Sequence, residues 1–450
     1  MDDSLETLAP DPATPVRQRL CIVLPTSGAF DSRSQRIAGS MVERGHDVTI
    51  IARRAPGLAD DETTPEGWRI VRVPVSAADG LPVPRIVRIA IANSRNRASE
   101  RSNAAAGART SASRQGSWRG APGRAIRSVW RMVAIGLTVR SQIAQARLVA
   151  PDADIYHGMA YMGIPVALAL GRRPGVNAVI YDARDIYVDA HNLALLPRPA
   201  RALLGRVERG WARRANRVVT VNRGYAEVMA AHWGMRLPLV VMNCSDARRG
   251  PRDRRFHDRF GLSAETPVVL YHGGLSPERG IEQLIAAMAQ LPRCVLVLMG
   301  YGALESRLPA MIAEHGLADR VRLLPPVPPG ELLDWVAASD IAAMPIQAST
   351  LNHRLTTPNK LFEAMAAGVP VVASDLPGMS QIIAETGCGL TCDPADPSSI
   401  ATTIRRIVDD PTASERMSAA GLAAASGTYS WSGQVEELAG EYTRLTRSPW

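Results

Sequence analysis

Lysine is almost absent from this sequence of 450 residues. Of its 52 basic residues, all except Lys360 are arginine. Arginine serves wherever a generic positive charge is sufficient, so the one compact ammonium group indicates a position where a planar guanidinium would not serve. The alternative is that Lys360 arose by neutral drift at one codon. The residues around it distinguish this from a requirement for lysine.

Cysteine and long apolar runs are also scarce. The five cysteines are scattered and form no disulfide framework, and Cys388 and Cys392 have no second Cys or His pair near them in sequence. No apolar run reaches the roughly 18 residues that span a bilayer, and residues 163–170 are among the longest. The acidic, proline-rich residues 2–15 lack the features of a secretory signal. We therefore expect a cytoplasmic protein with reduced thiols.

The net charge of +9 comes from one segment. Residues 85–131 contain eleven arginines and one acidic residue, Glu100, so the rest of the chain is close to neutral. Within this segment, residues 93–123 are Arg, Ser, Ala and Gly with almost no large apolar side chain, which predicts disorder or a mobile loop.

A helix predicted over residues 124–146 follows this loop. Four of its apolar residues share one face among arginines: Ile126, Trp130, Val133 and Leu137. Either this helix packs on the surface of its domain, or it docks on an anionic membrane or a polyanionic acceptor. Nucleic acid is not expected, because the aromatic interleaving of a strand-binding platform is missing.

The length of the chain and its alternating predicted strands and helices indicate two domains. A strand at 20–25, a helix at 34–44 and a strand at 47–52 form a βαβ unit and hence a parallel sheet. Further strands are predicted at 69–73, 155–157, 178–182, 217–221 and 239–242. Residues 245–255, rich in Asp, Arg, Gly and Pro, are predicted to be the linker.

The alternation then restarts. Strands are predicted at 268–272, 294–299, 321–324, 341–344, 369–373 and 389–392, with helices at 281–290, 331–339 and 359–367. Two such halves predict an α/β protein with two Rossmann-like doubly wound domains that face each other across a cleft.

Two glycine turns end strands of the second half. Gly273 and Gly274 follow the strand at 268–272 and precede a helix, and Arg279 can add its guanidinium to the same anion. Gly300 and Gly302 follow the next strand. Tight packing explains either turn alone equally well, but together they predict one phosphate-binding crevice at the carboxyl ends of the sheet.

The single lysine begins the helix predicted at 359–367, three residues before Glu363. The helix dipole repels an ammonium group at this end unless an anion is also present. Glu363 lies almost one turn later and can accept hydrogen bonds from vicinal ribose hydroxyls. A plain surface pair is the alternative, and it leaves the position of the only lysine unexplained.

The run Pro-Asn-Lys-Leu-Phe-Glu-Ala-Met-Ala-Ala-Gly-Val-Pro-Val-Val at 358–372 resembles the retaining glycosyltransferases of the GT-B fold, family 4. The resemblance extends from residue 268 to about residue 442, and more loosely to 31–33, 44–48 and 179–185. Residues 430–445 resemble the last helix of the family, which crosses back onto the first domain. The implied plan is a tail (1–16), an acceptor domain (17–245), a donor domain (256–428) and the crossing helix (429–450).

The resemblance also implies roles for single residues. Arg279 stands where the family has a diphosphate-binding lysine, and Glu363 is the second acid of a Glu, seven residues, Glu pattern. His157 matches a histidine that faces the transferred sugar, and Gly28 matches a turn where donor and acceptor approach. Asn359 and Lys360 stand where a subgroup of the family makes substitute donor contacts.

The sequence departs from the family at several positions. The first acid of the pair is replaced by Leu355, and Gly274 replaces an arginine of many relatives. Arg184 and Met159 stand where histidine is common. His353 and Thr356 are close enough in sequence to Lys360 to assist it.

The resemblance implies transfer of a sugar, with retention, from a nucleotide-diphosphate sugar to a hydroxyl of a glycan or lipid-linked acceptor of the cell envelope. No metal or other cofactor is expected, because the Asp-x-Asp triplet at 152–154 is far in sequence from the phosphate loops. Peripheral contact with the inner face of a membrane through the arginine-rich segment is a further expectation. Two alternatives remain: a non-catalytic subunit that binds nucleotide sugars, and a sugar-nucleotide epimerase.

Overall fold

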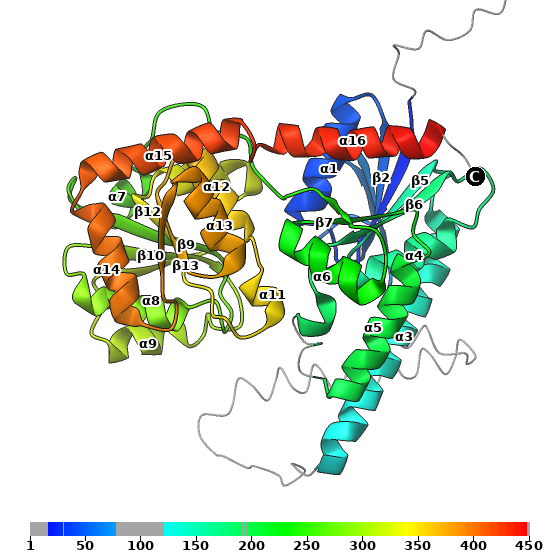
Figure 1. Cartoon of the computed structure of the whole chain (residues 1–450), viewed down its shortest axis with the longest axis horizontal. Helices are drawn as coiled ribbons and strands as arrows, with labels where there is room; N and C mark the ends of the chain where they lie inside the picture. Colours follow the sequence, from blue (N-terminus) through cyan, green and yellow to red (C-terminus); the bar gives the residue numbers. More distant parts are fainter. Residues whose placement is uncertain (1–16, 30, 78–120, 191–192, 194–195, 448–450) are drawn as a thin grey trace, which may run out of the picture. The chain divides into compact units, whose positions relative to one another are not determined.

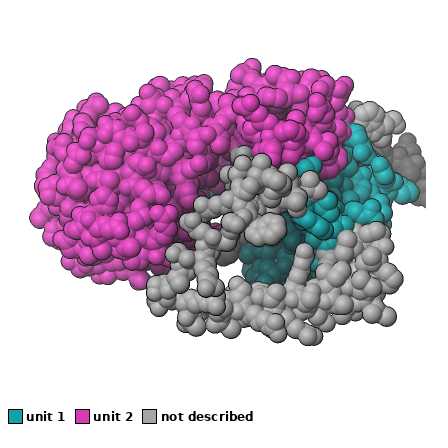
Figure 2. Space-filling model, turned by 90° about the horizontal axis from the view of Figure 1, so that it is seen from below, with its two compact units in different colours: residues 1–182, 214–216, 439–450 teal, residues 183–213, 217–438 magenta. Residues whose placement is uncertain are grey.

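The computed structural model describes residues 17–29, 31–77, 121–190, 193 and 196–447 (Figure 1). The tail at 1–16 and most of the segment expected to be disordered, 93–123, lie outside the described residues. The chain forms two compact units (Figure 2). Residues 1–182, 214–216 and 439–450 make up unit 1, and residues 183–213 and 217–438 make up unit 2.

The first sheet has eight strands in the order β3-β4-β2-β1-β5-β6-β7-β8. Their bounds are β1 Arg19–Val23, β2 Asp47–Arg53, β3 Asp61–Thr63, β4 Arg69–Val73, β5 Ile155–Met159, β6 Ala178–Ala183, β7 Arg217–Thr220 and β8 Leu239–Val240. β3 pairs antiparallel with β4, whereas β1 pairs parallel with both β2 and β5. The strand order reverses between β1 and β5, and ligands of such sheets bind at the carboxyl ends beside this point.

The second sheet has six strands in the order β11-β10-β9-β12-β13-β14, and all its pairs are parallel. Their bounds are β9 Val268–Gly274, β10 Val295–Tyr301, β11 Val321–Leu324, β12 Ile341–Met344, β13 Val371–Ser374 and β14 Gly389–Cys392. Counted along the chain this is the order 3-2-1-4-5-6 of a Rossmann sheet, with its switch point between β9 and β12. The first glycine turn therefore ends the strand beside the switch point.

Helices cover both faces of the second sheet. Alternate residues of β9 belong to two apolar cores, with Val268 and Leu270 in one and Val269 and Tyr271 in the other. The first core includes residues of α10 (Leu332–Ala337), α12 (Asn359–Ala367) and α13 (Pro377–Thr386). The second includes residues of α8 (Ile281–Ala287), α9 (Leu308–Glu314) and α14 (Pro397–Val408).

Of the remaining helices, α15 (Pro411–Ser426) packs on α12 in unit 2, and the others flank the first sheet or connect elements. The bounds of these others are α1 Ser32–Glu43, α3 Ala121–Val149, α4 Ala160–Leu170, α5 Arg198–Ala212, α6 Arg223–Trp233, α7 Arg255–Phe260, α11 Leu351–Arg354 and α16 Trp431–Arg447. Asp31 caps α1 by accepting a hydrogen bond from the backbone of Ser34. The last helix contributes residues 431–438 to unit 2 and residues 439–447 to unit 1.

The two halves of α3 differ in packing. Its carboxyl-terminal half buries Val139, Gln142 and Ala146. Trp130 is 68% exposed and Val133 is 44% exposed, so the apolar face predicted for this helix is not packed at these positions. Among the described residues, no helix is both long and apolar enough to cross a membrane.

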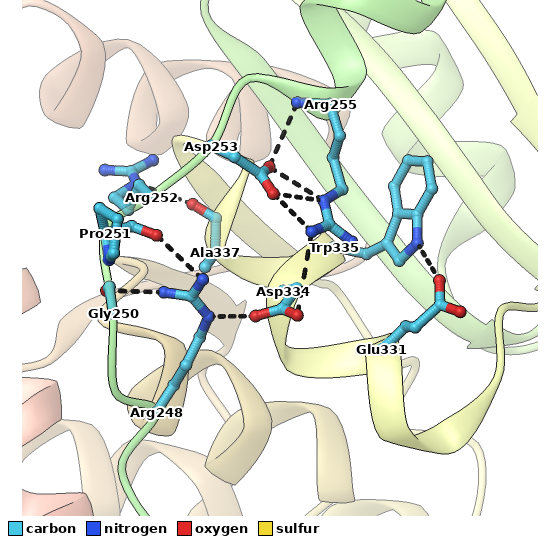
Figure 3. A network of polar contacts seen from close by, with 10 residues as sticks. All are labelled: Arg248, Gly250, Pro251, Arg252, Asp253, Arg255, Glu331, Asp334, Trp335 and Ala337. Carbon is cyan, nitrogen blue, oxygen red and sulfur yellow. Dashed lines mark hydrogen bonds and ion pairs between the residues drawn. The ribbon is translucent and has the colours of Figure 1, made fainter.

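The predicted linker at 245–255 lies within unit 2, where its arginines contact α10 (Figure 3). Arg248 donates to a carboxylate oxygen of Asp334 over 2.5 Å, and the guanidinium of Arg255 lies 5.1 Å from the ring centroid of Trp335. Arg252 donates to the carbonyl oxygen of Ala337 over 2.7 Å. Three arginines thus hold this linker against α10.

Candidate functional site

The two predicted glycine turns lie side by side in the second sheet. Gly300 of β10 is in register with Gly273 of β9, and a Cβ atom on Gly300 would lie 1.9 Å from the carbonyl oxygen of Gly273. A Cβ atom on Gly302 would lie 2.3 Å from the carbonyl oxygen of Leu275. Close backbone packing therefore requires Gly300 and Gly302, whereas a Cβ atom on Gly274 would be 3.8 Å from its nearest contact.

The ammonium group of Lys360 lies next to the first turn. Its Nζ atom is 3.7 Å from the ring centroid of Tyr271, and a Cβ atom on Gly273 would be 3.7 Å from the same Nζ. The side chain is buried, and among the described residues Nζ has no hydrogen-bond partner. A surface pair with Glu363, the alternative considered from the sequence, is therefore wrong.

Burial and charge both act on this ammonium group. Burial lowers the pKa of Lys360 well below its usual value, the positive charge of Arg279 lowers it further, and the negative charge of Glu363 opposes them. Lys360 is also in the first turn of α12, which no side chain of the described residues caps. An anion at this point would stabilise the charged lysine and accept from the uncapped N–H groups.

Glu363 has a buried partner that the sequence analysis did not identify. The Nε2 atom of His272 lies 2.9 Å from Oε2 of Glu363, and the two side chains are 4% and 8% exposed. A carboxylate only accepts hydrogen bonds, so Nε2 donates. The available signal in the sequence was His272 itself, a polar residue that follows the apolar run at 268–271 and directly precedes Gly273.

Arg279 follows a residue with strained backbone in the loop after β9. Glu278 has φ 67°, a left-handed conformation that is uncommon outside glycine. Its carboxylate accepts from the hydroxyl of Ser349 over 2.9 Å, and this hydroxyl lies 2.8 Å from Nδ1 of His353. The predicted helper His353 is thus connected to the Arg279 loop.

Leu355, which stands in place of the first acid of the family pattern, has a packing role. The side chain of Leu355 packs against α6. A Cβ atom built on Gly224 of α6 would lie 3.3 Å from Cδ2 of Leu355. The carbonyl oxygen of Leu355 accepts from the amide of Asn222 over 3.0 Å. Asn359 is exposed as the first residue of α12.

In unit 1, Gly28 lies in a loop whose carbonyl groups are held by side chains. Gly28 has φ 81°, and its carbonyl oxygen accepts from Gln35 over 2.9 Å. Arg72 donates to the carbonyl oxygen of Ser27 over 3.0 Å, and Gln142 donates to that of Leu24 over 2.7 Å. Side chains from α1, β4 and α3 therefore fix this loop at the carboxyl end of β1.

His157 is buried in unit 1 and is 1% exposed. Its Nδ1 atom lies 2.6 Å from the hydroxyl of Tyr442 in α16, and its Nε2 atom lies 3.3 Å from a carboxylate oxygen of Asp182. Both ring nitrogens thus face protein groups. This packing favours a structural role for His157, between β6 and α16, over the direct contact with a sugar that the resemblance implies.

The Asp-x-Asp triplet has a structural partner. Asp154 accepts from the backbone N–H of Arg19 over 2.8 Å and from its guanidinium over 2.7 Å. Among the described residues, no group of three or more His, Cys, Asp or Glu side chains could hold a metal ion.

Comparisons with known proteins agree with this architecture. Residues 253–423 match the family model of glycosyl transferases group 1. An alpha-D-kanosaminyltransferase of Streptomyces kanamyceticus is 26% identical over 287 residues, which cover 61% of this chain and 72% of the relative. A D-inositol 3-phosphate glycosyltransferase of Thermobispora bispora is 31% identical over 200 residues, 41% of this chain and 45% of the relative. This second match spans less than half of the relative.

Solved structures resemble the whole chain. Sucrose-phosphate synthase of Thermosynechococcus elongatus has a TM-score of 0.71 and 18% identity, with 96% of this chain and 100% of the other covered. HepE of Anabaena in complex with UDP-glucose has a TM-score of 0.64 and 17% identity, with coverages of 95% and 100%. The fold of this protein is GT-B, as its sequence predicts.

Proposed function

We propose that this protein is a glycosyltransferase that transfers a sugar from a nucleotide-diphosphate donor to a hydroxyl group of an acceptor. One observation carries the proposal: the ammonium group of Lys360 is buried beside Gly273, and no described residue gives it a hydrogen bond. A buried ammonium group without a partner is costly, and a bound pyrophosphate would supply the missing acceptors. The turn lies beside the switch point of the sheet, where such ligands bind in related folds.

The donor contacts follow from the same cluster. Lys360, Arg279 and the uncapped start of α12 direct positive potential at the diphosphate. Glu363, held by His272, accepts hydrogen bonds from the ribose hydroxyls. The UDP and UDP-glucose complexes of HepE, a fold relative, support a nucleotide sugar as the ligand class.

The chemistry requires stabilisation of a leaving group. As the bond between the anomeric carbon and the phosphate oxygen breaks, negative charge develops on the diphosphate, and the fixed cations stabilise it without a metal. The acceptor oxygen bonds to the anomeric carbon from the same face, and a phosphate oxygen of the donor takes its proton. This course retains the anomeric configuration and requires no base from His157, whose ring nitrogens face Tyr442 and Asp182.

The acceptor that we propose is a glycan or lipid-linked hydroxyl of the cell envelope, reached from the cytoplasmic face of the membrane. The exposed Trp130 and Val133 of α3, beside Arg131, support contact with an anionic membrane.

Vesicle binding tests this contact. The double variant Trp130→Ser, Val133→Ser should reduce cosedimentation with phosphatidylglycerol vesicles. Leu148→Ser, at the other exposed end of the helix, should not. Equal binding by all three proteins would contradict this contact.

Thermal unfolding with nucleoside diphosphates tests the donor site. Stabilisation by at least one of UDP, ADP, GDP and dTDP is expected, and Lys360→Met should remove it. Slow hydrolysis of the matching nucleotide sugar would distinguish an enzyme from a binding subunit. Conversion of the donor sugar without an acceptor would instead indicate an epimerase. No stabilisation by any of the four nucleotides would contradict the proposal.

A further inference from the structure

The carboxylate of Glu363 has two basic neighbours with different relationships to it. Lys360 is three residues earlier on α12, so the two side chains share a face of the helix. The ammonium group of Lys360 nevertheless makes no hydrogen bond within the described part of the chain. His272, from a different element, donates to Oε2 of Glu363 over 2.9 Å. Lys360 thus contributes a nearby charge, and His272 provides the directional contact.

The histidine is held by the sheet. β9 lies between β10 and β12, and His272 is in register with Met299 of β10. It is 4% exposed and directly precedes Gly273, the glycine beside Lys360. Because pairing with β10 holds its backbone and the side chain is buried, the imidazole is a rigid donor. A rigid donor restricts the rotation of the carboxylate that accepts from it.

We infer that His272 is a positioning residue that orients Glu363 toward the ribose of the bound nucleotide. The inference rests on the proposed function, which makes Glu363 the ribose ligand. It separates the two parts of the donor site: Lys360 and Gly273 serve the diphosphate, whereas His272 acts through Glu363 on the nucleoside. Loss of the imidazole should therefore weaken nucleoside recognition and leave diphosphate binding intact.

A purely structural role for the contact between His272 and Glu363 predicts a different result. If the histidine only satisfied a buried acid in the core, its loss would lower stability and would weaken all anionic ligands alike. The ratio of the affinities for a nucleoside diphosphate and for inorganic pyrophosphate separates the two roles. Both ligands carry the diphosphate, and only one carries the ribose.

The experiment is isothermal titration of the full chain with inorganic pyrophosphate and with whichever of UDP, ADP, GDP and dTDP the wild type binds best. His272→Phe fills the volume without a donor. It should weaken the nucleotide about tenfold or more and pyrophosphate less than about twofold. His272→Gln places an amide donor near the Nε2 position and should restore nucleotide affinity to within about threefold of the wild type.

His272→Asn provides a second measurement if the phenylalanine variant does not fold. Its amide is too short to reach Glu363, so the same selective loss is expected. Equal losses for both ligands, or no loss for either, would overturn the positioning role while the proposed function stands. A wild-type protein that binds pyrophosphate but none of the four nucleotides would overturn the proposed function, and this inference with it.

Discussion

The Nε atom of Arg33 lies 2.8 Å from Oδ2 of Asp182, and both side chains are buried in unit 1. The same carboxylate oxygen is 3.3 Å from His157, which in turn reaches Tyr442 of α16. Residues of α1, β5, β6 and α16 therefore share one chain of buried polar contacts. Each charge in it depends on its partner, because an unpaired charge in a core is costly.

Removal of either charge of this pair should destabilise the protein. Arg33→Met leaves a buried carboxylate and Asp182→Asn leaves a buried guanidinium, so each should lower the free energy of unfolding by about 3–5 kcal/mol. Urea denaturation monitored by circular dichroism measures the change. The double variant should lose less than the sum of the single losses, since the second change removes the charge that the first left unpaired. Additive losses would contradict the coupling.

The contribution of Asp182 should depend on pH. Burial acts to raise the pKa of this carboxyl, but Arg33 and His157 outweigh burial and lower the pKa to about 2. In the unfolded chain the carboxyl titrates near its ordinary value of about 3.9. A depressed pKa in the folded state adds about 2 to 3 kcal/mol of stability, fully present above about pH 4 and lost as the pH falls toward 2.

The stability difference between the wild type and Asp182→Asn measures this contribution, because other carboxyl groups titrate in both proteins. The difference should be constant from pH 7 to about pH 4.5 and should shrink at lower pH. A difference that increases as the pH falls would show that Asp182 is not held ionised in the folded state.

Most of the fold could be predicted from the sequence because short-range patterns determine it. The bounds predicted for α12 are those observed, since Pro358 precedes its first residue and Gly368 follows its last in the left-handed conformation. The antiparallel edge strand β3, three residues long, was not predicted. Its sequence Asp-Glu-Thr has no apolar alternation, and pairing with β4 alone makes it a strand.

The site could be predicted only in part, because its main contacts are non-local. The sequence shows that Lys360 and Glu363 share a helix face, but not that Lys360 is buried over the ring of Tyr271, 89 positions away. The contact between His272 and Glu363 spans 91 positions. The burial of His157 between Asp182 and the last helix likewise depends on tertiary packing.

Alanine should be tolerated at one glycine of the two turns and not at another. Gly300→Ala would place a Cβ atom 1.9 Å from a backbone oxygen, so we expect a loss of about 3 kcal/mol in the free energy of unfolding. Gly274→Ala has room for the methyl group and should change stability by less than about 0.5 kcal/mol. Thermal denaturation without ligand compares them, and similar melting temperatures would contradict the close approach of the two strands.

Release of the linker should expose it to trypsin. Asp334→Ala removes the carboxylate that Arg248 contacts and that lies 3.8 Å from Arg255, which should increase opening of the linker about fivefold. Mass spectrometry of the early fragments should then show faster cleavage within residues 248–255. Asp409→Ala removes the exposed pair with Arg293 and should leave the cleavage rate unchanged. Equal acceleration in both variants would indicate general destabilisation instead.

Binding of a diphosphate should be coupled to proton uptake at Lys360. Burial and the charge of Arg279 lower the pKa of this ammonium group in the free protein, Glu363 opposes them, and Tyr271 contributes its ring face. Its pKa is about 10.4 in an unfolded chain. Between these two pKa values the unfolded chain therefore binds more protons, and the stability of the free protein should rise with pH.

A bound diphosphate reverses this shift, because its negative charge stabilises the charged lysine and raises the pKa of Lys360 again. Titration calorimetry of a nucleoside diphosphate at pH 8 to 9, above the phosphate pKa of about 6, should give enthalpies that differ between Hepes and Tris buffers. The difference should correspond to uptake of up to one proton for each nucleotide bound. Lys360→Met should remove this difference in whatever binding remains. Wild-type binding whose enthalpy is the same in both buffers throughout this range would contradict proton uptake at Lys360.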